Sequence, residues 1–251
     1  LRWVLVMRKA LVLLLSGALL SSATPARAQE VAETIVPDRP GLGDGAHVVG
    51  AGVVQVEVGV EAAIGSGGDV FTFGQSLVRY GVGGIEIRIF PGSVLIADDE
   101  RGAPDPGVGL KVPLSSGDGP LFSAVLSTTL PVGSAAFSAG EARGAATLVA
   151  EFTLSDALGL ALNAGYGFPF AHVDDGAVSF VVTPGLSLAS VDGLGLYAGY
   201  AGSYGPGDDE HFAEAGGVYV PDADKQWDLN WGIETGSRRW FLGVGFSYRW
   251  R

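Results

Sequence analysis

Cysteine is absent from the 251 residues of the chain, and histidine occurs only three times. Without cysteine the chain can form neither a disulfide nor a lipidated N-terminal cysteine. An exported form must therefore gain its stability from a packed core or from a membrane. The same scarcity leaves no cluster of cysteine and histidine ligands for zinc. A disulfide-stapled fold, a lipoprotein and a structural zinc site are thus excluded.

Basic charge is also scarce. The chain has 15 lysines and arginines against 27 aspartates and glutamates, which gives a net charge of −12. Binding to nucleic acid, or to anionic lipid through a basic patch, needs clustered Lys and Arg side chains. We therefore expect no nucleic-acid partner and no peripheral attachment to an anionic membrane surface.

A long apolar run is missing as well. The apolar stretch at 10–20 is shorter than the roughly 20 residues of a membrane-spanning helix. Arg8 and Lys9 precede it, and small residues ending in Ala-Arg-Ala at 26–28 follow it, which is typical of a secretory signal and its cleavage site. We expect residues 1–28 to be a signal peptide, with Met7 as the translation start and export through the Sec pathway. The alternative is an uncleaved N-terminal membrane anchor.

Glycine, in contrast, is abundant at 40 residues, and the mean hydropathy is positive. A disordered glycine-rich chain is not this apolar. Instead, apolar side chains alternate with polar or small ones over about ten residues, as in "VVQVEVGVEA", "GIEIRIF" and "QWDLNWGIE". A period of two predicts strands at 52–62, 69–80, 83–91, 106–113, 120–131, 143–154, 156–168, 177–189, 192–204, 210–220, 225–235 and 239–250.

This pattern predicts an all-β fold, an antiparallel up-and-down transmembrane β-barrel of about twelve strands over residues 51–251. Alternate connections are short, such as 81–83 and 221–224, whereas 92–105, 132–141 and 169–176 are longer. Short periplasmic turns and longer outer loops are the barrel arrangement. The competing architecture is a secreted β-sandwich. Against it, the less apolar strand faces are dominated by Gly and Ala, which are poor choices for a water-exposed strand face.

The two faces of each strand have separate predicted roles. Outward-facing aromatic residues are expected to contact outer-membrane lipid, namely Trp227, Trp231, Trp240, Phe246, Tyr248 and Trp250. The opposite faces are expected to line the lumen with Gln55, Glu57, Glu61, Glu86, Arg88, Lys111, Glu151, Asn163, Glu214, Asp228, Asn230, Glu234 and Arg249. Acidic residues predominate, which favours cations or neutral solutes if the lumen is open. Alternatively, these charges pair across a narrow, packed barrel.

The segment before the first strand resembles a known family. Asp38-Arg39-Pro40, a polar spacer and a strand carrying Gln55, Glu57 and Gly59 resemble the opening of a family of outer-membrane barrels described as transporters of the meta pathway of phenol degradation. The closing "FLGVGFSYRW" and "TLPVG" at 129–133 resemble that family's last strand and Leu-Pro-x-Gly turn. The chain departs from the pattern at Pro37, where Thr or Glu is usual. It also ends on Arg251, whereas an aromatic end is read by the barrel assembly machinery.

Residues 29–50 form a predicted N-terminal arm that is long enough to fold back into the lumen. Asp38, Arg39 and Pro40 are then candidates for a plug or gate, paired with lumenal charges. The alternative is a solvated periplasmic tail that ends in a turn.

The resemblance implies a channel for passive uptake of small solutes, with aromatic or hydrophobic compounds as the implied class. The alternative is a plugged structural or adhesive barrel with acidic outer loops. Catalysis is not expected, because His172 and His211 lie in acidic loops without a recognisable catalytic partner. Those loops lack the regular spacing of a calcium site. We expect no cofactor and no metal. The expected partners are outer-membrane lipid, the barrel assembly machinery and a small-molecule solute.

Overall fold

The computed structural model describes residues 34–66, 68–207 and 209–251. The predicted signal peptide and the start of the predicted arm, residues 29–33, lie outside the described residues. Thirteen strands form one sheet: β1 Val54–Ile64, β2 Val70–Val82, β3 Ile85–Ala97, β4 Glu100–Gly102, β5 Gly107–Pro113, β6 Leu121–Thr129, β7 Arg143–Thr153, β8 Leu158–Pro169, β9 Ala177–Ser187, β10 Leu194–Tyr204, β11 Glu210–Asp222, β12 Lys225–Glu234 and β13 Arg239–Trp250. A short 3-10 helix, η1 Val173–Asp175, follows β8.

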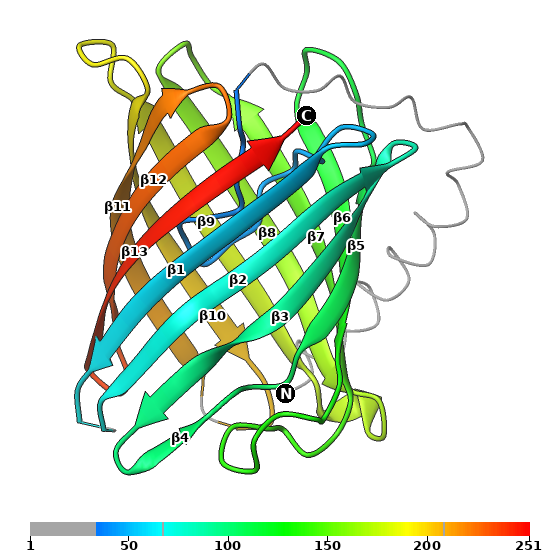
Figure 1. Cartoon of the computed structure of the whole chain (residues 1–251), viewed down its shortest axis with the longest axis vertical. Coiled ribbons are helices and arrows are strands. Elements are labelled where there is room, and N and C mark those ends of the chain that lie inside the picture. The colour runs from blue at the N-terminus through cyan, green and yellow to red at the C-terminus, as the bar shows by residue number, and fades with distance from the viewer. Residues whose placement is uncertain (1–33, 67, 208) are drawn as a thin grey trace.

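The sheet closes on itself. Each strand pairs antiparallel with its neighbour along the chain, and β1 pairs with both β2 and β13. The small strand β4 pairs only with β3, so twelve strands form the wall (Figure 1). The predicted twelve-stranded up-and-down barrel is confirmed, and the sandwich alternative is wrong because a sandwich has two separate sheets.

One predicted loop contains regular structure. Residues 92–105 were predicted as an irregular outer connection, but β3 continues to Ala97 and turns back into β4. The apolar stretch Val94-Leu95-Ile96 extends the strand, and Asp98, with a φ of 50°, makes the turn. The hairpin of β3 and β4 therefore extends beyond the rim of the barrel wall (Figure 1).

The barrel is inverted relative to a soluble protein. Outward-facing Trp227, Trp231, Trp240 and Trp250 are each about half exposed, whereas charged side chains such as Arg79, Glu57 and Glu86 are buried inside. Water favours the opposite distribution, and lipid favours this one. Phe246 and Tyr248 also face outward and pack on the rings of Trp227 and Trp250.

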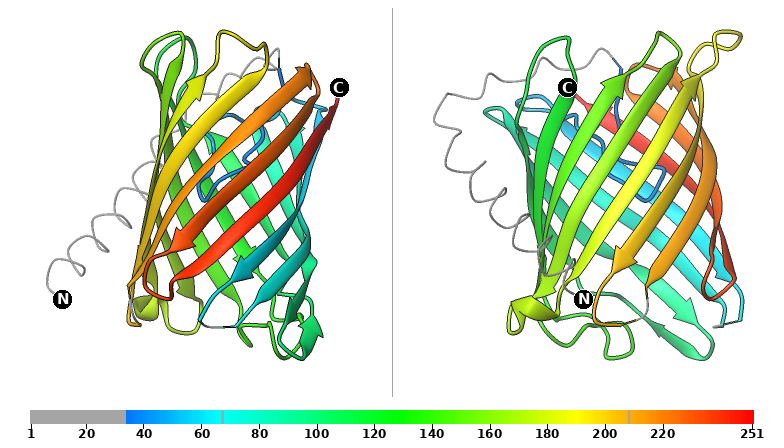
Figure 2. Two further views of the ribbon diagram at one scale, coloured as in Figure 1. Left: turned by 90° about the vertical axis from the view of Figure 1, so that its left-hand side faces the viewer. Right: turned by 180° about the vertical axis from the view of Figure 1, so that it is seen from behind.

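The two ends of the barrel differ. The end that contains the chain's C-terminus carries the tight β2–β3 and β11–β12 turns, and the other end carries β4 and the long β6–β7 connection (Figures 1 and 2). Short turns face the periplasm in bacterial barrels. We therefore call the C-terminal end the periplasmic mouth. No helix among the described residues is long and apolar enough to span a membrane.

Candidate functional site: a charged arm inside the lumen

The lumen contains a segment of the chain itself. Residues 34–53, here called the arm, enter at the periplasmic mouth, turn inside the barrel and return to the wall before β1 (Figures 1 and 2). The Ile35 amide donates to the Ala223 carbonyl over 2.7 Å at the β11–β12 turn. At the other end, the Gly52 amide donates to the Gly81 carbonyl over 2.9 Å. The arm is thus tied to two sides of the same mouth.

The return of the arm depends on Gly81. A Cβ at this position would lie within 3.0 Å of the Gly50 carbonyl, so only glycine lets the arm's backbone cross so close to β2. Gly52, with a φ of 81°, interrupts the extended backbone before β1 begins at Val54. The first strand therefore starts slightly later than the sequence pattern predicts, and residues 51–53 still belong to the arm.

Asp38 is the most heavily paired side chain of the arm. Its carboxylate lies 2.7 Å from the Lys111 Nζ, 2.5 Å from an Arg88 guanidinium nitrogen and 3.6 Å from Arg79. Burial raises the pKa of Asp38, but Arg79, Lys111 and Arg88 outweigh burial and hold that pKa well below its ordinary range. The carboxylate is therefore ionised at every physiological pH and binds three strands of the wall at once.

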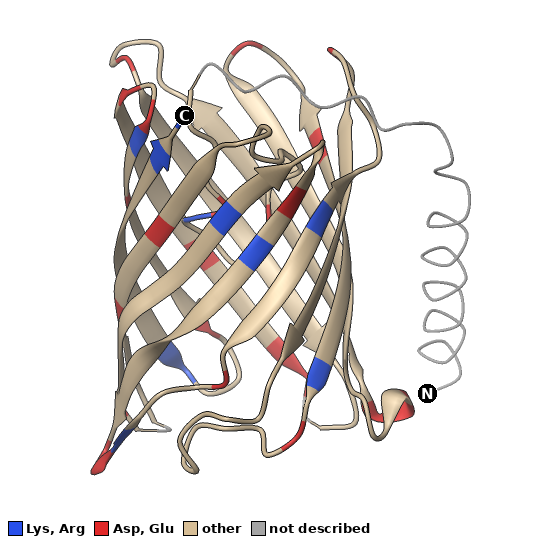
Figure 3. Cartoon of the chain, turned by 45° about the vertical axis from the view of Figure 1, so that its right-hand side comes forward, with Lys and Arg blue, Asp and Glu red and all other residues tan. Residues whose placement is uncertain are grey.

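Two of the three cations around Asp38 have further acidic partners. Arg79 lies 3.0 Å from Glu57 and 2.8 Å from Glu86, and Arg88 lies 2.7 Å from Asp44 in the arm. Removing one member of such a buried network leaves another charge unpaired, which typically costs about 3–5 kcal/mol. Figure 3 shows these charges as bands across the strands in the half of the barrel nearest the C-terminus.

Wall side chains also satisfy the arm's backbone, which has no regular secondary structure of its own. The Glu57 carboxylate accepts hydrogen bonds from the Asp38 and Arg39 amides, each at 3.0 Å or slightly longer. Further along, Glu86 accepts from the Val49 amide, and Asn163 from the Asp44 amide. Buried amides need such partners. Side chains of the wall therefore determine the path that the arm's backbone takes inside the barrel.

Arg39 lies in a slot on the inner wall. Gly59 of β1 and Gly245 of β13 are directly paired, and a Cβ on either would lie within 3.0 Å of the Arg39 guanidinium group. The guanidinium donates to Gln75 over 3.1 Å and lies 3.4 Å from Asp228. Pro40 follows through a cis peptide bond and is half-buried. The three residues of the Asp-Arg-Pro element therefore all lie inside the barrel.

The predicted lumenal residues lie on the inner side of the wall. The buried ones are Gln55, Glu57, Glu86, Arg88, Lys111, Asn163, Glu214, Asp228, Asn230 and Arg249, and the half-buried ones are Glu61, Glu151 and Glu234. Most contact the arm or each other. Arg249 lies at the periplasmic rim, where it donates to the Thr34 carbonyl of the arm over 3.3 Å and lies 2.9 Å from Asp224 of the β11–β12 turn. Burial raises the pKa of Asp224, but Arg251 and Arg249 outweigh this and lower it below its ordinary value.

Arg79, which is fully buried at the centre of the network, is not among the predicted lumenal residues. The alternation along β2 changes phase at a bulge, because the register shifts around Gly74, which has a φ of 72°. Thr72 faces inward before the bulge, and Gln75 and Arg79 face inward after it. The glycine inside the strand pattern was the available signal.

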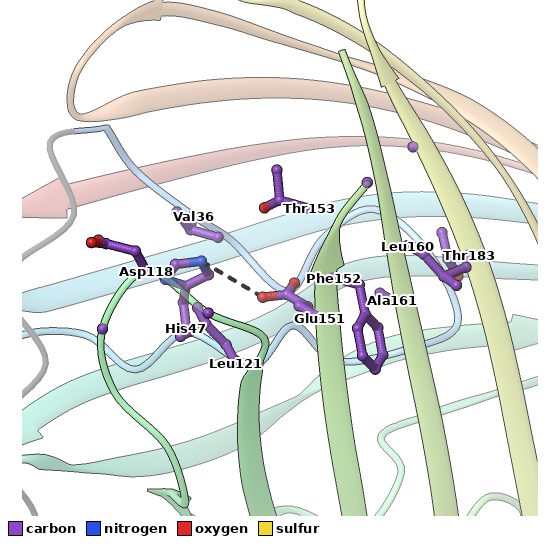
Figure 4. Close-up of a pocket in the computed structure, with 14 residues that line it drawn as sticks. Val36, His47, Asp118, Leu121, Glu151, Phe152, Thr153, Leu160, Ala161 and Thr183 are labelled. Atoms are coloured by element: carbon purple, nitrogen blue, oxygen red, sulfur yellow. Dashed lines mark ion pairs between the residues drawn. The ribbon is translucent and has the colours of Figure 1, made fainter. Parts of the chain in front are cut away.

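A cavity of about 500 Å³ lies beside the arm at the periplasmic mouth. Val36 and His47 of the arm, the 117–119 turn and the inner faces of β7 and β8 line it (Figure 4). His47 lies 3.6 Å from Glu151. Burial lowers the pKa of His47 below 6.5, and Lys111 and Arg79 lower it further, while Glu151 opposes them. The cavity therefore has a titratable residue of the arm in its wall.

The other two histidines lie away from the arm. His211 contacts the Tyr200 hydroxyl at 2.6 Å, and His172 precedes η1. No group of three or more His, Asp or Glu side chains in the described part of the chain could hold a metal ion. What the site does show is a polar lumen with a tethered segment in it.

Three solved structures with the same fold are described as an outer membrane channel or as porins. An outer membrane channel from Pseudomonas putida F1 matches with a TM-score of 0.63 at 13% identity, covering 84% of this chain and 99% of that one. The KdgM porin in complex with disordered oligogalacturonate matches with a TM-score of 0.58 at 12% identity, covering 78% and 99%. The NanC porin matches with a TM-score of 0.58 at 10% identity, covering 77% and 98%. At these identities the likeness shows the fold alone.

Among curated proteins, no sequence matches this chain. A family match covers nearly all of the barrel and the Asp-Arg-Pro element, from residue 37 to residue 250. The likeness that those motifs carry in the sequence is thereby confirmed: the chain belongs to the outer-membrane barrel family described as "Putative MetA-pathway of phenol degradation".

Proposed function

We propose that the protein is an outer-membrane channel for the passive uptake of small solutes, and that the arm narrows its lumen and controls passage. The observation that carries this proposal is the arm itself, held inside a closed barrel by charged contacts with β1, β2, β3 and β5. A structural wall needs no such segment in its lumen. Export through the Sec pathway and insertion by the barrel assembly machinery belong to the same proposal.

The chemistry of the interior supports diffusion of polar or charged solutes. Charged and amide side chains line the lumen, and the cavity beside His47 gives solutes room at the periplasmic mouth. The family's description connects its members with phenol degradation, so small aromatic compounds are part of the proposal. Polar groups placed along a wide enough path select solutes by charge and hydrogen bonding.

The second candidate is a permanently plugged barrel with a structural or adhesive role. The density of buried ion pairs around Asp38 favours it, because a gate must be able to move. The two candidates differ in one measurable property, which is whether ions cross the barrel.

The decisive experiment records single-channel conductance in planar bilayers while the arm is locked or free. A Cβ at Gly43 of the arm would lie 3.2 Å from the Val181 side chain of β9, which brings a Gly43→Cys/Val181→Cys pair within reach of a disulfide. Because the natural chain has no cysteine, this pair is the only thiol chemistry in the variant. The oxidised and reduced forms of one protein serve as each other's control.

A controlled channel should conduct more, or switch more often between levels, in the reduced form than in the oxidised one. Equal conductance in both forms would support the channel and contradict the proposal that the arm controls passage. Silence in the wild type and in both forms of the variant would contradict the channel and favour the plugged barrel. Each single-cysteine variant controls for the substitutions themselves.

A further inference from the structure

The two sides of the lumen differ in how well their charges are matched. Around Asp38, the cations Arg79, Arg88 and Lys111 face four carboxylates within ion-pair distance. On the wall formed by β1, β11, β12 and β13, the carboxylates of Glu61, Glu214 and Asp228 face the lumen. Among the ion pairs of the described residues, only one involves this second group, and it joins Asp228 to Arg39.

The second group, here called the acidic track, consists of Glu61, Glu214 and Asp228 together with Asn230. Glu61 lies within hydrogen-bonding reach of Asn230, and its charge acts on Glu214. One Glu214 oxygen accepts from the Leu42 amide of the arm over 2.9 Å. These contacts connect the track to one part of the lumen, beside the first turn of the arm.

Several acceptor atoms of the track are buried without a hydrogen-bond donor among the described residues: Glu214 Oε2, Asp228 Oδ2 and Asn230 Oδ1. Their side chains are well buried, since Glu214 is 5% exposed, Asp228 4% and Asn230 7%. A buried acceptor without a partner is costly, and a buried charge more so. All three atoms accept hydrogen bonds, so the group that completes them must donate, and the two carboxylates favour a donor that carries positive charge.

Arg39 satisfies only some of the acceptor atoms of the track. Its guanidinium nitrogen is 3.4 Å from Asp228, longer than the 2.7–2.9 Å usual for charge-assisted bonds, and its Nε has no partner in the described part of the chain. Arg79, by contrast, holds Glu86 through two bonds of 2.8 Å. Arg39 is therefore a loosely held cation at the edge of a site that has more acceptors than Arg39 uses.

Glycines of the wall let the side chains of the track lie close against it. Gly243 lies beneath the Asn230 side chain, Gly245 beneath Asp228, and Gly199 beside Glu214, and a Cβ at any of them would crowd the acceptor above it. A bare metal ion is not the natural occupant, because no described cluster has metal-binding geometry. A guanidinium or ammonium group, with several N–H donors and no acceptor, fits the unpaired atoms.

We propose that the acidic track is a binding site for the cationic group of a small organic solute, and that Arg39 competes with this solute from within the chain. The proposal deepens the proposed function, because it names a solute class for the same lumen. Binding of the solute at Asp228 displaces the guanidinium of Arg39 and loosens the arm at that point. Arg39 is then a positioning residue and not part of the ligand's own contacts.

The test measures binding of agmatine, a small molecule with one guanidinium and one ammonium group, to the purified full-length protein by titration calorimetry. We expect Glu214→Gln and Asp228→Asn each to weaken binding on the order of tenfold or more, since each removes a charge-assisted hydrogen bond. Arg39→Gln should strengthen binding, because it removes the competitor. Asp192→Asn, on an exposed turn at the same mouth, removes one negative charge elsewhere and should leave binding unchanged.

Calorimetry keeps this inference separate from the proposed function, since binding is measured whether or not the barrel conducts. Equal affinity in all variants, no binding to the wild type, or weaker binding in Arg39→Gln would overturn it. A variant that fails to fold is recognised by its loss of heat-resistant mobility on a gel. The comparison of Arg39→Gln with the wild type then still tests the proposal, because the expected result is stronger agmatine binding, which a misfolded protein would not show. In bilayers, agmatine at the same concentration should raise wild-type conductance, because it loosens the arm at Arg39. A channel that conducts equally with and without agmatine would retain the function and refute the site.

Discussion

Asp38 of the arm and Lys111 of β5 lie 2.7 Å apart inside the barrel, although 73 residues separate them in the sequence. Lys111 also donates to the Gly45 carbonyl over 2.8 Å, and the Asp38 carboxylate accepts from the Gly45 amide over the same distance. The arm is therefore closed into a loop by the same charges that bind it to the wall. Loosening it requires breaking a network and not a single bond.

Replacing Asp38 should release the arm. In Asp38→Asn the amide cannot compensate Lys111, Arg88 and Arg79, so the arm's docking should weaken by about 3–5 kcal/mol. We expect higher conductance and a lower midpoint of urea unfolding. Asp44→Asn is the matched comparison, because Asp44 contacts only Arg88 among these cations and is more exposed. An Asp38 variant no different from the Asp44 variant would contradict the central role of Asp38.

The slot for Arg39 gives a second prediction. Gly245→Ala places a methyl group within 3.0 Å of the Arg39 side chain and of Asp228, so the guanidinium must leave its position. We expect greater accessibility of the arm to protease and altered conductance, with the barrel still folded. Gly167→Ala in β8 is the control, since a Cβ there meets nothing within 4 Å. Equal behaviour of the two variants would show that Arg39 adapts without cost.

Acidification should loosen the arm in two stages. The reason is that two residues of the arm, His47 and Asp38, have pKa values below their ordinary ones. A lowered His47 pKa means that the docked arm favours neutral His47, so this contribution is complete above pH 6.5 and is lost as pH falls below 6.5. The Asp38 contribution is complete above pH 3.8 and is lost only at lower pH. Conductance recorded against pH should rise in these two steps.

His47→Gln separates the two stages. This variant should lose the step below pH 6.5 and keep the step below pH 3.8, because glutamine does not titrate. If protonated His47 instead pairs with Glu151 strongly enough to hold the arm, the first step would be absent from the wild type. The Glu151→Gln variant would then show the step that the wild type lacks.

Much of the fold follows from residue periodicity. In β1 and β13 the alternation is unbroken, and the predicted inward positions, such as Glu57 and Arg249, are buried. The phase is lost where an extra residue enters a strand, and for that reason Arg79 could not be placed. The extension of β3 into a hairpin with β4 was also missed, because short apolar runs with acidic ends resemble loops.

The candidate site was only partly predictable. The composition of the arm suggests charges that need partners, but which wall residues meet them depends on the staggering of twelve strands around a barrel. Asp38 meets Arg88 and Lys111 through pairings that no local pattern encodes. Gly59 and Gly245 look like ordinary strand glycines in the sequence. Their role appears only when β1 and β13 lie side by side with Arg39 above them.

The lipid-facing wall gives a prediction with a depth dependence. Leu229 lies outward near the middle of β12 and is half exposed, so Leu229→Arg puts a charge at the centre of the apolar band. Such a change costs about 2–4 kcal/mol at the bilayer midplane and about 0–1 near the interface. Leu154 is also exposed but lies just beyond the end of β7, so Leu154→Arg should cost little. Urea titrations of folding into lipid vesicles measure the free energy of unfolding of both variants. Equal losses in Leu229→Arg and Leu154→Arg would contradict an apolar band that crosses the middle of the strands.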